Sequence, residues 1–227
     1  MAEALTSEQR ILLWDLDGTI IDSLGILEAG LGVVLPQHGL QLPPRDVLAA
    51  NFHGSLEDSI SNALGGLNTT KLASVVRDFL VVQDREYEVV ESHIFPDALE
   101  LARRAHAARY WQVLVTNRAH EGRLRASPRS IVANSSLRDY IDVVVCGDDS
   151  QHRKPNAAVL GNLRDRMQGA EVTVVGDQFV DAEFARNLGA RAILVCRDGA
   201  EPAHMERLGS DWQSFVTVIP SLMDVEL

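Results

Sequence analysis

The feature that most constrains this chain is a set of five short apolar runs, separated by segments of helical periodicity. Each run is rich in Val, Ile or Leu and shows little alternation of apolar and polar side chains. Such strands suit a parallel sheet that is covered by helices on both faces. The sequence therefore predicts an α/β fold with a Rossmann-like, doubly wound parallel sheet, and the expected strands are residues 11–14, 112–115, 143–146, 172–175 and 192–196.

The connection between the first two runs is far too long for one crossover between parallel strands. Across residues 22–95, apolar side chains recur at helical spacing and are interrupted by glycine and proline breakers. This pattern predicts a small α-helical domain inserted after the first strand. We therefore expect two domains, an α/β core formed by residues 1–22 and 96–227 and a helical domain formed by residues 23–95.

The charge balance and the cysteine count exclude several functional classes. With 21 Lys and Arg against 32 Asp and Glu, the formal net charge is −11. Such an acidic chain neutralises a phosphate backbone poorly, so we expect no nucleic-acid partner, although a few local cations can still hold a small anionic substrate. Cys146 and Cys196 lie in apolar runs or at their ends, where we expect core packing rather than a disulfide framework or a zinc site.

Nothing in the sequence predicts contact with a membrane. The first ten residues are polar and lack the apolar region of a signal peptide. No stretch approaches the roughly 20 apolar residues that cross a bilayer. We therefore expect a cytoplasmic protein, and its oligomeric state stays open between a monomer and a homodimer.

Two carboxylates follow the first apolar run, at the point where the strand should end. Asp15 and Asp17 are two residues apart, so on an extended chain they point the same way, and Gly18 then permits a sharp turn. Open α/β sheets bind ligands at the carboxyl ends of their strands. Because two crowded carboxylates repel each other, the pair needs a cation or a shared proton. The pattern indicates a metal site or an acid/base pair, with a polar turn after a strand as the simpler alternative.

Polar groups also follow the second and third runs. Thr116, Asn117 and Arg118 come directly after the second run, where they could join a helix start in an anion cradle; the alternative is a threonine cap and a solvated arginine. Lys154 precedes Pro155, a residue that suits the first turn of a helix. A lysine there can bind phosphate or pair with a carboxylate, although a surface lysine is the simpler interpretation of this motif alone.

Two more carboxylates follow the fourth run. Asp177 lies just past the expected strand, and Asp181 lies four residues later. One aspartate at the start of a helix can be merely a cap. Two that share a sheet edge with Asp15 and Asp17 are harder to explain in that way, and their hard oxygen ligands suit Mg²⁺ with a substrate phosphate. Together, the polar groups predict a site for a metal-bound phosphoryl group.

In this order, the four segments resemble the motifs of the haloacid dehalogenase superfamily of phosphohydrolases. The matching residues are Asp15-Leu16-Asp17-Gly18-Thr19, Thr116-Asn117, Lys154-Pro155, and Gly176-Asp177 with Asp181. The helical insertion and the segment Ile21-Asp22-Ser23 resemble the phosphoglycolate phosphatase-like subgroup, in which the insertion is a cap domain. Trp14, Asp97 and Arg118 depart from the pattern, because Phe, Gly and Lys are more usual there.

The resemblance implies a Mg²⁺-dependent phosphatase that hydrolyses a small phosphorylated metabolite, phosphoglycolate-like or sugar-phosphate-like, through an aspartyl-phosphate. Asp15 would be the nucleophile and Asp17 the general acid and base. The implied metal ligands are Asp15 and Asp177 through their carboxylates and Asp17 through its backbone carbonyl. Asp181 would anchor a metal-bound water or pair with Lys154.

The resemblance also implies substrate contacts. Thr116, the Asn117 backbone and Lys154 would bind the phosphoryl oxygens. In the cap, His53-Gly54-Ser55 occupies the position of a substrate-facing loop. A phosphomutase of the β-phosphoglucomutase kind shares all four motifs and is the nearest alternative enzyme. A non-catalytic binding or regulatory protein on the same fold is the other alternative.

Overall fold

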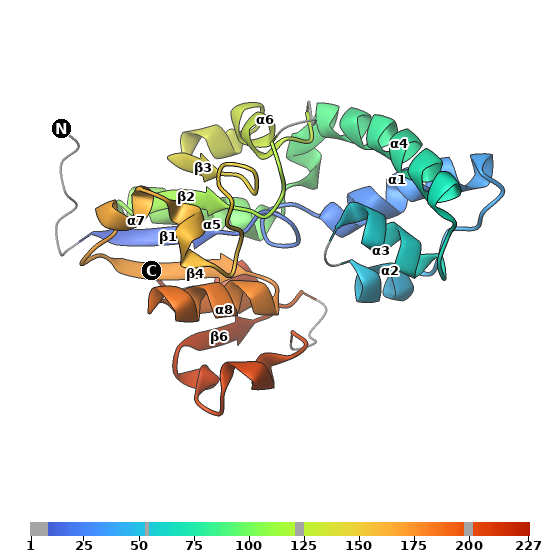
Figure 1. The fold of residues 1–227 in the computed structure, drawn as a ribbon. Helices are drawn as coiled ribbons and strands as arrows, with labels where there is room; N and C mark the ends of the chain where they lie inside the picture. Colours follow the sequence, from blue (N-terminus) through green and yellow to red (C-terminus); the bar gives the residue numbers. More distant parts are fainter. Residues whose placement is uncertain (1–8, 53–54, 121–124, 198–201) are drawn as a thin grey trace. The chain divides into compact units, whose positions relative to one another are not determined.

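Figure 1 shows a computed structural model of the 227-residue chain. The structure describes residues 9–52, 55–120, 125–197 and 202–227. Contacts between Cα atoms divide the chain into two compact units, which we call the sheet unit and the helical unit. The sheet unit consists of Met1–Ile21, Ile94–Arg123 and Ser127–Leu227, and the helical unit consists of Asp22–His93 and Leu124–Ala126.

The sheet unit contains six parallel strands in the order β3-β2-β1-β4-β5-β6. The strands are β1 (Arg10–Trp14), β2 (Trp111–Val115), β3 (Val143–Val145), β4 (Glu171–Gly176), β5 (Arg191–Val195) and β6 (Val216–Ile219). Because all pairs are parallel, the carboxyl ends meet at one edge of the sheet. The strand order reverses at β1, and open α/β sheets bind ligands at such a reversal. The predicted parallel α/β fold is therefore confirmed.

One strand, β6, has no counterpart among the five that the sequence predicts. It pairs with β5 at the end of the sheet. Val216 is buried whereas the next residue, Thr217, is exposed. An outer strand covered on one face alternates in this way, so it lacks the continuous apolar run that marks the inner strands.

Helices cover both faces of the sheet. The helices of this unit are α5 (Pro96–Ala107), α6 (Pro128–Ala133), α7 (Leu163–Arg166) and α8 (Phe179–Leu188). Short 3-10 segments add η2 (Ser136–Asp139), η3 (Ala157–Leu160), η4 (Met205–Leu208), η5 (Trp212–Ser214) and η6 (Leu222–Asp224). Ile11 and Leu13 of β1 share a core cluster with Phe184 of α8. Side chains alternate along a strand, so Trp14 faces the other side, toward α5.

A buried polar pair joins β1, β2 and α5. The indole Nε1 of Trp14 donates a hydrogen bond to Gln112 Oε1 at 3.0 Å, and Gln112 Nε2 donates to the carbonyl oxygen of Ala102 at 2.9 Å. Both side chains are fully buried. A buried indole N–H needs an acceptor, which Gln112 supplies here. Gln112 therefore accommodates a tryptophan at a position where phenylalanine would need no partner.

We expect Gln112→Leu to lower the free energy of unfolding by about 1–3 kcal/mol, because it leaves the Trp14 N–H buried without an acceptor. Trp14→Phe in the same chain removes the stranded donor and should recover part of the loss. Urea unfolding of the two single variants and the double variant measures the coupling. Simple addition of the two single effects would contradict this explanation of the pair.

The helices of the helical unit lie between β1 and β2 in the chain, as predicted. Its helices are α1 (Ser23–Gln37), α2 (Arg45–Asn51), α3 (Leu56–Ala63) and α4 (Thr69–Glu86), followed by the 3-10 segment η1 (Tyr87–His93). Its core contains Leu31, Leu35, Ile60, Val75 and Phe79, which are fully buried. The domain boundaries near residues 22 and 96 stay predictions. Within the described part of the chain, no helix combines the length and the apolar character that a membrane span requires.

Candidate active site

Three predicted site residues lie where neighbouring strands end. Asp15 directly follows β1, Thr116 follows β2 and Asp177 follows β4. The N–H of Asp15 donates to the carbonyl oxygen of Val175 at 2.8 Å, and the N–H of Thr116 donates to that of Val145 at 3.0 Å. These bonds extend the parallel ladder past the strands. The sheet itself therefore fixes the backbone on which the candidate site is built.

The ammonium of Lys154 lies between two carboxylates. Its Nζ donates to Asp15 Oδ1 at 2.5 Å and to Asp181 Oδ1 at 2.7 Å. The side chains of Lys154 and Asp181 are only 3% and 1% exposed, so each charge is stabilised by the other rather than by hydration. Burial lowers the pKa of Lys154, but the two carboxylates outweigh burial and raise it above its ordinary value. Lys154 is thus a buried cation, and the surface-lysine alternative is wrong.

Asn117 holds the backbone of Lys154 in place. Its Nδ2 donates to the carbonyl oxygen of Lys154 at 3.1 Å, and its Oδ1 accepts from the Lys154 N–H at 2.8 Å. The expectation that Pro155 lies in the first turn of a helix is wrong, because the chain forms the short 3-10 segment η3, which begins at Ala157. The side chain of Asn117, rather than a helix start, therefore positions Lys154.

Asp181 reaches the same cluster from the first turn of α8. Its Oδ2 accepts from the N–H of Gln178 at 3.2 Å, as part of a capping box that fixes the start of the helix. Its Oδ1 accepts from Lys154. A Cβ at Gly176 would lie 2.4 Å from Asp181 Cγ, so the last residue of β4 has to be glycine. Asp181 is therefore both a helix cap and the second carboxylate partner of Lys154.

The turn after β1 orients Asp177. Thr19 Oγ1 donates to Asp177 Oδ1 at 3.1 Å. Gly18 has a φ of +81°, and a Cβ there would lie 2.2 Å from Asp177 Oδ2. Both the backbone conformation and the close approach of the carboxylate require glycine at this position. The glycine and the threonine of the first motif thus shape the position of a carboxylate on another strand.

Three carboxylates gather at this edge of the sheet. Asp15, Asp177 and Asp181 each contribute an oxygen to a group whose atoms lie within 4.8 Å of one another. Burial raises the pKa of Asp15 to about 7, with Lys154 opposing the shift and Asp181 adding to it. Burial, together with the charges of Asp15 and Asp181, raises the pKa of Asp177 well above its ordinary value. One ammonium does not balance three carboxylates, so the set of hard oxygen ligands fits a divalent cation such as Mg²⁺.

Asp17 faces a different partner. Its carboxylate pairs with the guanidinium of Arg118, in which Nε donates to Asp17 Oδ2 at 3.1 Å and Nη2 contacts Oδ1. The Arg118 side chain is 9% exposed, so the alternative of a solvated arginine is wrong. For Arg118, the sequence predicts either a place in an anion cradle with Thr116 and Asn117 or a solvated side chain, and it does not predict the pairing with Asp17. The two carboxylates of the first motif therefore pair with different cations.

The family of this chain follows from a match over most of its length. The family model of the haloacid dehalogenase-like hydrolases, which describes the sequences of that family, matches residues 9–189 of this chain. The chain belongs to this family. The resemblance inferred from the four motifs is therefore confirmed, and so is the expectation that the protein is an enzyme of this hydrolase family.

Individual relatives are distant but match nearly the whole chain. A phosphoglycolate phosphatase of Nitrosospira multiformis is 25% identical over 221 residues, which cover 95% of this chain and 93% of the relative. A phosphoglycolate phosphatase of Chromobacterium violaceum is 28% identical over 212 residues, which cover 89% of this chain and 90% of the relative. Both matches thus extend over the strands and the helical insertion of this chain.

Solved structures show the same fold. A predicted phosphoglycolate phosphatase from Haemophilus somnus has a TM-score of 0.74 at 16% identity, with 97% of each chain covered. CbbY from Rhodobacter sphaeroides, in complex with xylulose-1,5-bisphosphate, has a TM-score of 0.64 at 16% identity, with 95% of this chain and 96% of the other covered. At this identity the structural likeness establishes the fold alone.

The remaining predicted site residues have separate places. Thr116 is buried beside the end of β2, and its Oγ1 accepts from the Arg118 N–H at 3.1 Å. Ser55 belongs to the helical unit, where it caps α3 by accepting from the Asp58 N–H at 3.0 Å. His53 and Gly54 lie outside the described residues. The role of the segment 53–55 in substrate contact stays a prediction.

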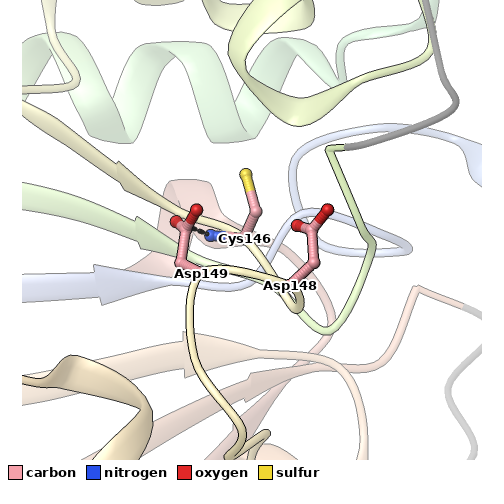
Figure 2. A group of neighbouring side chains, drawn as sticks. All are labelled: Cys146, Asp148 and Asp149. Carbon is pink, nitrogen blue, oxygen red and sulfur yellow. Dashed lines mark hydrogen bonds between the residues drawn. The ribbon is translucent and has the colours of Figure 1, made fainter.

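A second group of possible metal ligands follows β3, formed by Cys146, Asp148 and Asp149 (Figure 2). Asp149 Oδ2 accepts from the Cys146 N–H at 2.7 Å, and both Asp149 oxygens accept from the Arg129 guanidinium. Burial raises the pKa of the Cys146 thiol to about 11, so it holds its proton at neutral pH. These contacts stabilise the turn after β3. The Cys146 side chain is buried, as the sequence predicts for a cysteine used in packing.

The predicted role of Asp15 as a metal ligand implies that Mg²⁺ stabilises this hydrolase more at about pH 8 than at about pH 6, because a ligand has to be ionised and Asp15 takes up a proton below its pKa of about 7. At saturating Mg²⁺ the melting temperature should rise by about 4 °C or more at the higher pH. Thermal melts with Mg²⁺ and with EDTA measure the difference, and Asp177→Asn serves as the variant that loses it. Equal stabilisation at both pH values would contradict this assignment.

Proposed function

We propose that this hydrolase is a Mg²⁺-dependent phosphatase that cleaves a small phosphorylated metabolite through an aspartyl-phosphate at Asp15. The observation that carries the proposal is the buried contact of Lys154 with both Asp15 and Asp181, beside the carboxylate of Asp177. A cation held against a carboxylate nucleophile can receive the negative charge of a phosphoryl group. The relatives with phosphoglycolate phosphatase activity support the same reaction class.

In the first step, an oxygen of the Asp15 carboxylate attacks phosphorus, and the bond from phosphorus to the leaving oxygen breaks. Asp17 in its protonated form donates its proton to that oxygen, which leaves as an alcohol, and the ionised Asp17 carboxylate that results is the form that pairs with Arg118. In the second step, a water attacks phosphorus while Asp17 takes a proton from it. The bond between phosphorus and Asp15 then breaks, which releases phosphate and restores the carboxylate.

The chain's cations and amides would hold the phosphoryl oxygens through both steps. Lys154 contributes its ammonium, and Thr116 and the Asn117 backbone contribute neutral hydrogen bonds. Asp15, Asp177 and the backbone carbonyl of Asp17 would bind Mg²⁺, with Asp181 anchoring a metal-bound water. When bound, the ion neutralises charge on the phosphoryl oxygens as it redistributes.

The substrate is proposed as a small phosphomonoester of the phosphoglycolate or sugar-phosphate class. The helical unit would act as a cap over the leaving group, with His53, Gly54 and Ser55 among its contacts. A cytoplasmic location and a monomeric or homodimeric state belong to the same proposal. The two units together would then provide the chemistry and the choice of substrate.

The direct test is phosphate release from p-nitrophenyl phosphate and from a panel of glycolate and sugar phosphates, with Mg²⁺ and with EDTA. Asp15→Asn should lower kcat by about 10³-fold or more, because it removes the nucleophile. Asp148→Asn is the matched control, since this aspartate lies at the same sheet edge outside the cluster, and it should retain wild-type activity. Undiminished release from Asp15→Asn would refute the proposal, whereas interconversion of sugar phosphates without net release would favour a phosphomutase.

We expect Arg118→Met to lower kcat/KM more for an alkyl phosphate than for p-nitrophenyl phosphate. The guanidinium holds the Asp17 carboxylate, and a poor leaving group depends more on a well-placed general acid. A difference of about tenfold between the two substrates is the expected size. Arg129→Met, which removes the partner of Asp149 near the same edge, is the control. The same loss for both substrates would show that Arg118 does not act through Asp17.

A further inference from the structure

Arg197, in the segment that follows β5, connects the turn after β1 to the start of α5. Its Nη2 donates to the carbonyl oxygen of Thr19 at 3.1 Å and to Asp97 Oδ1 at 2.8 Å. Its guanidinium carbon lies 3.8 Å from the centroid of the Phe95 ring, as in a cation–π contact. The Arg197 and Asp97 side chains are 24% and 16% exposed, so this ion pair is better shielded from water than an ordinary surface pair.

Asp97 is itself held from a third direction. Its Oδ2 accepts from the Leu222 N–H at 2.9 Å and from the Ser221 hydroxyl at 3.2 Å, in the segment that follows β6. The carboxylate therefore has partners for both oxygens and offers Arg197 a fixed point of attachment. An ion pair anchored in this way can fix the position of a third group rather than merely join two mobile side chains.

That third group is the turn after β1. The carbonyl oxygen of Thr19 accepts from Arg197, and the carbonyl oxygen of the next residue, Ile20, accepts from the Phe95 N–H at 2.9 Å. Two consecutive carbonyls of the turn are thus bound by the start of α5 and by Arg197. On its other side, Thr19 donates its hydroxyl to Asp177. Any shift of Thr19 away from Arg197 also shifts the donor that orients the Asp177 carboxylate.

We propose that the ion pair of Asp97 and Arg197 sets the affinity of the site for Mg²⁺, by holding Thr19 where its hydroxyl orients Asp177. The inference rests on the proposed function, in which Asp177 is a metal ligand. Partners of metal ligands typically contribute 10- to 100-fold to metal affinity, because they orient the ligand before the ion arrives. Among the described residues, the contacts of Arg197 and Asp97 given above lead to Thr19 and not to a proposed reacting group, so we treat both as positioning residues and not as catalytic ones.

The test is calorimetric titration of the folded protein with Mg²⁺ in the absence of substrate. Arg197→Met should raise the Kd for Mg²⁺ about tenfold, and Thr19→Val, which removes the hydroxyl itself, should raise it at least as much. The Kd of Arg197→Lys for Mg²⁺ should lie between those of Arg197→Met and the wild type, because lysine keeps a cation near Asp97 with fewer hydrogen-bond donors. Arg191→Met is the matched control. It removes an exposed ion pair with Glu171 at the opposite end of β5 and should leave the Kd unchanged.

Activity provides the second measurement. In Arg197→Met, the Mg²⁺ concentration for half-maximal phosphatase activity should rise with the Kd, and added Mg²⁺ should restore most of the rate. A wild-type Kd in Arg197→Met, with only a lower melting temperature, would overturn the inference and leave the proposed function standing. A wild-type protein that binds no Mg²⁺ would overturn both. Should Arg197→Met fail to fold, Arg197→Lys and Asp97→Asn carry the same comparison, and a wild-type Kd in both would overturn the inference.

Discussion

Lys154 places an ammonium between Asp15 and Asp181, in a position that water reaches poorly. Crowding three carboxylates at one sheet edge is costly, since each loses hydration and repels the others. The buried cation offsets part of that cost, and the raised pKa values of Asp15 and Asp177 show that a part remains. The cluster therefore keeps unbalanced negative charge, and this favours the binding of a cation such as Mg²⁺.

The sheet provides the geometry for this arrangement. Parallel strands end at one edge, and the reversal of strand order at β1 leaves space for loops from both sides. The contacts that complete the site then join distant segments, such as Asn117 with Lys154 and Thr19 with Asp177. Glycine is required where these segments approach too closely for a Cβ. The close contacts between the segments that follow the strands thus hold both the edge of the sheet and the candidate site in place.

Much of this arrangement could be predicted from the sequence. The apolar runs predicted the parallel sheet, and the position of Asp15 and Asp177 just after two of them predicted that their carboxylates would meet. Arg118 was visible as a cation, but its partner was not, because a pair 101 residues apart leaves no periodic signal. The same holds for Gln112 with Trp14 and for Asp97 with Arg197. Pairs of this kind depend on tertiary packing, which a single sequence does not specify.

In the proposed mechanism, Asp15 carries the phosphoryl group during turnover. Reduction with borohydride during early turnover converts an aspartyl-phosphate to homoserine, which mass spectrometry of the peptides can place in the sequence. We expect homoserine at residue 15 of the wild-type protein incubated with Mg²⁺ and p-nitrophenyl phosphate, and none in Asp15→Asn. Modification at another carboxylate such as Asp177, or steady phosphate release with no modified residue at all, would contradict it.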